Sequence, residues 1–80
     1  MSREPRPFVV FGFGTTHDAL AAEDVLLEAG LDAVPVPAPK VLGAKCGIAI
    51  RIPQGQSASA REGLQSASIA VVSEAPLLDI

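Results

Sequence analysis

Residues 8–30 read FVVFGFGTTHDALAAEDVLLEAG, and this stretch decides the fold. Its opening part, residues 8–13, is continuously apolar and rich in β-branched and aromatic side chains, which predicts a central strand. Gly14 then breaks the strand, and Thr15 is expected to cap a helix whose third residue is Asp18, in a variant of the capping box. Apolar residues recur at helical spacing after the cap: Ala19, Ala22, Leu26 and Ala29. The glycine that closes the stretch is expected to end the helix.

Residues 31–37 are predicted to form a second strand, and their prolines indicate its place in the sheet. In an extended strand the backbone nitrogens of Pro35 and Pro37 point the same way, so both missing donors can lie on one unpaired edge. We therefore expect an edge strand. A loop over residues 38–46 leads to a third strand at 47–52. One face of that strand carries the isoleucines Ile48, Ile50 and Ile52.

The last third of the chain is predicted to hold a turn, a helix and a strand. Residues 53–55, Pro-Gln-Gly, form the turn. A second helix is expected at 57–67, with Ser59 and Glu62 as its capping signature. Residues 69–73 are expected to form the final strand.

The order strand, helix, strand, strand, helix, strand predicts an α+β protein with the ferredoxin-like βαββαβ fold, a two-layer sandwich with an antiparallel sheet. Right-handed crossovers that leave room for an inserted strand give the sheet order 4-1-3-2, with the proline-bearing second strand at an edge. We expect residues 1–7 to be a flexible N-terminal arm, residues 8–74 a single domain and residues 75–80 a C-terminal tail.

Charge and composition argue against several classes of partner. The 80 residues carry a net charge of −3, with 6 Lys and Arg that are scattered singly, and the aromatic side chains are 3 Phe. Neither a phosphate-binding stripe nor a base-stacking platform is expected, so nucleic acid is an unfavoured partner. A lone cysteine forms no internal disulfide, and no signal peptide or membrane-length apolar segment is visible. We therefore expect a reduced thiol, a cytoplasmic protein and no membrane partner.

Cys46, where the loop becomes the third strand, offers more chemistry than any other residue. The predicted topology brings this loop to the end of the sheet where the first helix begins. The thiol is thus expected near Thr15, Thr16 and His17, on the face that the helices cover. The positive end of the helix favours a thiolate, so we expect a depressed thiol pKa. A buried and inert cysteine is the alternative.

Further residues are expected to support this site. Gly47, next to the thiol, is grouped with the helix start as thiolate- or anion-stabilising. Lys40 and Lys45 either steer an anionic donor or are plain loop lysines. Glu23 falls on the apolar side of the helix, where it either snorkels or pairs with a loop lysine. His17 either tunes the thiol or is a solvated side chain.

Several short motifs are similar to those of a known family. They are residues 11–22 (FGFGTTHDALAA), Glu23, Gly30, Pro39 and residues 46–50 (CGIAI). Over about residues 8–52 they resemble a small bacterial domain family described as putative selenium/sulfur carrier protein-like. The resemblance implies that Cys46 carries sulfur or selenium, as a persulfide or selenosulfide, between a donor enzyme and an acceptor protein. The better-understood sulfur-relay carriers have Cys-Pro-x-Pro where this chain has Cys46-Gly47, so their mechanism is not transferred.

Three functional classes remain open on these features. The first is a sulfur or selenium carrier without turnover of its own. The second is a non-enzymatic regulatory, ligand-binding or protein-binding module, possible as a homodimer, in which the cysteine is structural. The third is a metal-handling protein, which we rank last because one Cys and one His supply two soft ligands per chain. No Ser-His-Asp arrangement is evident and Asn is absent, so we expect neither catalysis nor a cofactor or metal.

Overall fold

The structure, a computed structural model, describes residues 6–38 and 47–79. The elements in these ranges are β1 (Arg6–Gly12), α1 (Thr16–Glu28), β2 (Val34–Pro37), β3 (Ile48–Pro53), the 3-10 turn η2 (Gln54–Gln56), α2 (Ser57–Ser66) and β4 (Ser73–Asp79). The strands form an antiparallel sheet of order β2-β3-β1-β4. This is the predicted order seen from the opposite edge, so the α+β class and the strand order are confirmed.

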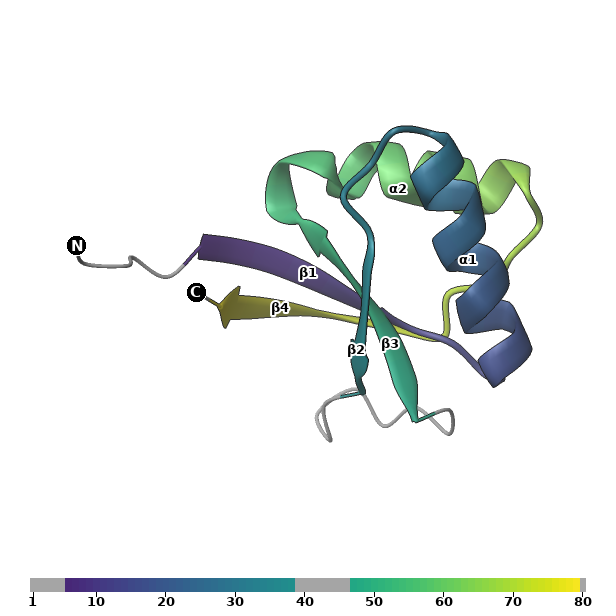
Figure 1. The fold of residues 1–80 in the computed structure, drawn as a ribbon, viewed down its shortest axis with the longest axis horizontal. Helices are drawn as coiled ribbons and strands as arrows, with labels where there is room; N and C mark the ends of the chain where they lie inside the picture. The colour runs from purple at the N-terminus through teal and green to yellow at the C-terminus, as the bar shows by residue number, and fades with distance from the viewer. Residues whose placement is uncertain (1–5, 39–46, 80) are drawn as a thin grey trace.

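Both helices lie on the same face of the sheet, and the paired ends of β1 and β4 extend beyond them (Figure 1). The main core fills the space between the two layers. It consists of Val9, Phe11, Phe13, Ala19, Ala22, Leu26, Ala33, Ile50, Ile52, Ala60 and Leu64. Ile48 packs against this cluster, so the predicted isoleucine face of β3 is confirmed. The alanines of α1 and α2 have small side chains and let the helices approach the sheet closely.

The opposite face of the sheet carries a smaller apolar cluster built around Val10 and Ala49, both fully buried. Phe8 lies two residues before Val10 on β1, so its side chain faces the same side of the sheet. The guanidinium of Arg51 lies over the Phe8 ring, with its central carbon 4.3 Å from the ring centroid, within the range of a cation–π contact. Strand alternation thus gives β1 and β3 two distinct apolar sides.

β2 lies at an edge of the sheet, as its prolines predicted. The backbone N–H of Ala38 donates to the carbonyl of Gly47 over 3.0 Å, in register with the pairing of β2 and β3. Hydrogen-bonded and non-bonded pairs alternate along an antiparallel ladder, so Pro35 and Pro37 occupy the positions whose backbone groups point away from β3. The two missing donors therefore cost the sheet no hydrogen bond. The strand itself begins later than predicted, at Val34.

The ends of α1 follow from single residues. Thr15 caps the helix as predicted, because its Oγ1 accepts a hydrogen bond of 3.1 Å from the N–H of Asp18. At the other end Gly30 has φ 80. The N–H of Gly30 donates to the carbonyl of Leu27, and the N–H of Leu31 to that of Leu26, each over 3.0 Å. This pattern is a Schellman motif, and it satisfies carbonyls that the helix would otherwise leave open.

α2 starts at the predicted residue, but its predicted cap is wrong. The helix begins at Ser57 after the turn η2, its N-cap is Gln56 without a side-chain hydrogen bond, and Ser59 lies within the first turn, so the signature of Ser59 and Glu62 does not cap it. α2 ends in the same motif as α1, but its left-handed position holds Ser68, with φ 59. There the N–H groups of residues 68 and 69 donate to the carbonyls of residues 65 and 64.

The final strand was misplaced at residues 69–73. Ile69 and Val71 belong to the connection after α2 and pack against the main core, which explains their apolar character. β4 is formed by the residues that follow, and it pairs with β1 along its whole length. Pro76 is tolerated there because β4 is the other edge of the sheet. Residues 75–79, predicted to be a tail, therefore belong to the sheet, as do residues 6–7 of the predicted N-terminal arm.

Candidate functional site

The described residues of the predicted thiol site gather at one end of the sheet. Gly12, the last residue of β1, pairs with Ala49 of β3 and with Ser73 of β4. In the neighbouring ladder the last residue of β2, Pro37, pairs with Ile48. Gly47 precedes Ile48, and it therefore lies at the end of the sheet where β1 stops and the chain turns into α1 (Figure 1).

The start of α1 offers a polar, accessible surface at this end. Thr15, Thr16 and His17 are exposed. The first backbone N–H groups of a helix give its N-terminus a partial positive charge, which favours anions within about the first turn. The carboxylate of Asp18 lies in the same turn and itself interacts with this partial positive charge. Gly47 is exposed as well, and an added Cβ there would meet no atom within 4 Å.

Cys46, Lys40 and Lys45 lie outside the described residues, so the contacts expected of the thiol and of the two lysines stay predictions. Glu23 is half-buried on α1, next to the fully buried Ala22. Its expected pairing with a loop lysine stays untested.

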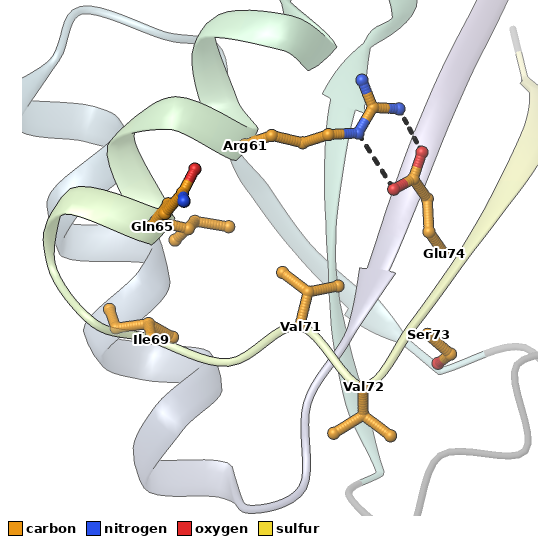
Figure 2. A pocket seen from close by; sticks show the side chains of 8 residues that line it. Arg61, Gln65, Ile69, Val71, Val72, Ser73 and Glu74 are labelled. Carbon is orange, nitrogen blue, oxygen red and sulfur yellow. Dashed lines mark hydrogen bonds and ion pairs between the residues drawn. The ribbon is translucent and has the colours of Figure 1, made fainter.

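A second candidate site, which the sequence analysis missed, lies between α2 and β4 (Figure 2). It is a groove with two cavities, of about 440 Å³ and about 300 Å³. The larger cavity is lined by α2, the connection after it and the start of β4, and the smaller one by η2, α2 and β4. Arg61 and Glu74 line both cavities, so this pair separates the two halves of the groove.

Arg61 and Glu74 form a bidentate ion pair. The Nε of Arg61 donates to Oε1 of Glu74 over 3.0 Å, and Nη2 donates to Oε2. The hydrogen bond from Arg61 lowers the pKa of Glu74 and raises that of Arg61. The two side chains are 48% and 37% exposed, so both charges remain accessible to a ligand.

The misplaced final strand explains why this pair was missed. Glu74 pairs with Phe11, whose side chain faces the helices, and so Glu74 also points toward α2. Arg61 occupies an outer position of α2, one residue after the buried Ala60. A strand drawn at 73–79 would have placed Glu74 on the side of the sheet that faces Arg61.

The helices and the antiparallel sheet together form a small two-layer α+β domain. A family model described as "Putative Se/S carrier protein-like" matches residues 8–73. The chain therefore belongs to this family, and the match runs beyond residue 52, where the resemblance from sequence motifs ended. No curated protein and no solved structure matches the chain.

Within residues 6–38 and 47–79, no helix is both long and apolar enough to cross a bilayer.

Proposed function

We propose that this protein carries sulfur or selenium on Cys46, as a persulfide or a selenosulfide, between a donor enzyme and an acceptor protein. The observation that carries the proposal is the family match, which spans the cysteine. The composition supports it, because Cys46 is the chain's single cysteine and no second thiol competes for the atom. In this proposal the protein binds and releases its cargo without catalytic turnover of its own.

The chemistry is a thiol exchange that needs no external oxidant. The thiolate of Cys46 attacks the outer sulfur of a donor persulfide, a new S–S bond forms on Cys46, and the S–S bond of the donor breaks. The donor leaves as a thiolate with its electron pair, and the proton of the persulfide travels with the transferred sulfur. A thiolate of the acceptor protein then attacks the outer sulfur on Cys46 by the same step and regenerates the Cys46 thiolate. A selenium atom would be transferred in the same way.

The end of the sheet where Gly47 lies supports a reactive thiol in this proposal. The start of α1 is at the same end, and its backbone N–H groups are suited to stabilise a thiolate or a persulfide anion. Thr15 holds these groups in place through the cap, while Thr16 and His17 border them. Lys40 and Lys45 are proposed to attract an anionic donor.

We also propose that the domain is ferredoxin-like. The proposal is supported by the element order and by the antiparallel pairing of every neighbouring strand in the order β2-β3-β1-β4. The connection from β1 to α1 and the connection from α2 to β4 both lie at the end of the sheet that holds Gly47. Donor and acceptor proteins are proposed to approach there, toward the segment that contains Cys46.

Intact mass spectrometry tests the carrier function. Wild type and Cys46→Ser are incubated anaerobically with glutathione persulfide, desalted, and measured before and after treatment with dithiothreitol. We expect wild type to gain the mass of one sulfur atom and to lose it on reduction, whereas Cys46→Ser gains nothing. A selenopersulfide donor provides the parallel measurement for selenium.

Two results would contradict the proposal. One is a wild-type mass that does not change with either donor. The other is an equal gain on Cys46→Ser, since the atom would then be held elsewhere. The rate of iodoacetamide alkylation at neutral pH, compared with that of glutathione, adds an independent measure, because a stabilised thiolate reacts faster than an ordinary thiol.

A further inference from the structure

The groove between α2 and β4 combines an apolar floor with two opposite charges. Leu64, Ile69 and Val71 line the larger cavity on its apolar side, and Leu64 is almost completely buried. Figure 2 shows Val71 pointing between α2 and β4 toward the ion pair, whereas Val72 points away. At about 440 Å³ the cavity falls in the range of roughly 300–1,000 Å³ that small-molecule sites occupy.

The ion pair at the rim keeps further hydrogen-bonding capacity. Glu74 engages Nε and Nη2 of Arg61, and Figure 2 shows the third nitrogen, Nη1, directed away from Glu74. A carboxylate has about four lone-pair sites, of which the two bonds from Arg61 use two. Among the described residues of the groove, Gln65 adds an amide one helical turn after Arg61, with both a donor and an acceptor.

We propose that this groove binds a free α-amino acid with an aliphatic side chain. The carboxylate of the ligand accepts hydrogen bonds from Arg61, its ammonium group donates to Glu74, and its side chain lies on the apolar floor. The ligand's carboxylate then lies beside Arg61 and its ammonium group beside Glu74, so each charge of the ligand contacts the opposite charge of the ion pair. Both charged side chains border both cavities, and a zwitterion in either half of the groove can reach the two of them.

This inference does not use Cys46 and is independent of the proposed carrier function. A ligand with one charge is disfavoured, because it would approach one partner of the ion pair with attraction and the other with repulsion. A ligand without an aliphatic side chain is disfavoured as well, because it would leave Ile69 and Val71 in contact with water. The groove thus selects for a zwitterion and for an apolar side chain together.

Titration of the isotope-labelled protein by NMR tests the proposal, with L-leucine as the probe. N-acetyl-leucine lacks the ammonium group, leucine amide lacks the carboxylate, and glycine lacks the side chain. We expect saturable binding of leucine with shifts at the Gln65 side-chain amide and the Val71 backbone amide. Each of the three analogues should bind at least about tenfold more weakly, because a lost charge-assisted hydrogen bond or buried side chain costs about that factor or more.

Variants of the groove residues provide a second test of the proposed binding site. Arg61→Gln and Glu74→Gln should each weaken leucine binding about tenfold or more, whereas Glu62→Gln, an exposed position of α2 outside the groove, should bind as wild type does. Circular dichroism checks that each variant is folded, and the analogue series needs no variant. The proposal is overturned if leucine causes no saturable shifts, if the shifts map outside the groove, or if N-acetyl-leucine binds as well as leucine.

Discussion

The two helices end in the same Schellman motif but with different residues in the left-handed position. Gly30 has φ 80 and Ser68 has φ 59. A residue with a side chain pays roughly 1–2 kcal/mol in this conformation, whereas glycine loses about 0.5–1 kcal/mol more backbone entropy on folding. We therefore predict that Ser68→Gly raises the free energy of unfolding by about 0.5–1 kcal/mol and that Gly30→Ser lowers it by a similar amount.

The surroundings of Gly30 make this comparison clean. A Cβ at Gly30 would meet no atom within 4 Å, so the cost of Gly30→Ser comes from the backbone conformation and not from a clash. Gly55 provides the matched control, because a Cβ there also meets nothing and its φ lies outside the left-handed region. Gly55→Ser should therefore leave the stability unchanged or slightly higher.

Urea denaturation followed by far-ultraviolet circular dichroism measures these differences. A change of 1 kcal/mol also corresponds to about 4–8 °C in the melting temperature of a domain of this size. The reasoning is refuted if Gly30→Ser is as harmless as Gly55→Ser, because the left-handed conformation would then carry no cost. It is equally refuted if Ser68→Gly destabilises the protein.

Three further predictions concern the cap, the core and the ion pair. Thr15→Ala should lower the free energy of unfolding in urea by about 1 kcal/mol and Thr15→Ser by much less; equal losses would contradict the cap. Leu26→Ala should lower the free energy of unfolding by about 2–5 kcal/mol, whereas Leu27→Ala, at a half-exposed position, should change it by no more than about 0.5 kcal/mol. If the two variants have similar melting temperatures, the assignment of Leu26 to the core and of Leu27 to the surface is wrong. Because Arg61 holds the folded-state pKa of Glu74 below the unfolded-state value, the pair stabilises fully above the unfolded-state pKa and loses its effect as pH falls through the folded-state pKa. The stability difference between wild type and Glu74→Gln should therefore shrink on acidification; a constant difference would rule out this linkage.

The features that the sequence predicted well depend on local rules. The edge position of β2 follows from the two-residue spacing of Pro35 and Pro37, which points both backbone nitrogens to the same side, since a proline in a central strand would remove a ladder hydrogen bond. The ends of α1 follow from Thr15 and Gly30, whose roles need no partner beyond the neighbouring turn. The order of the strands then followed from the handedness of the connections.

The features that the sequence did not predict depend on distant partners. Ser73–Asp79 includes Glu, Ala, Pro and Asp, all weak strand formers, and it becomes a strand because β1 is there to pair with it. The β-branched run before it resembles a strand, but Ile69 and Val71 serve the core from an irregular connection. The pairing of Arg61 with Glu74 could not be predicted for the same reason, because it depends on the correct position of β4.

The outward prolines of β2 have a consequence for the behaviour of the protein at high concentration. Along its free edge this strand presents carbonyl groups at Pro35 and Pro37 but no N–H donor at either position. Fibril growth by stacking of strands requires donors and acceptors in alternation, and an incoming chain would find half of its bonds unavailable here. Val34 is 38% exposed on the same strand and would otherwise add an apolar contact to such a template. The sequence VPVP thus protects the domain against amyloid-like self-assembly from this side while leaving every hydrogen bond to β3 in place.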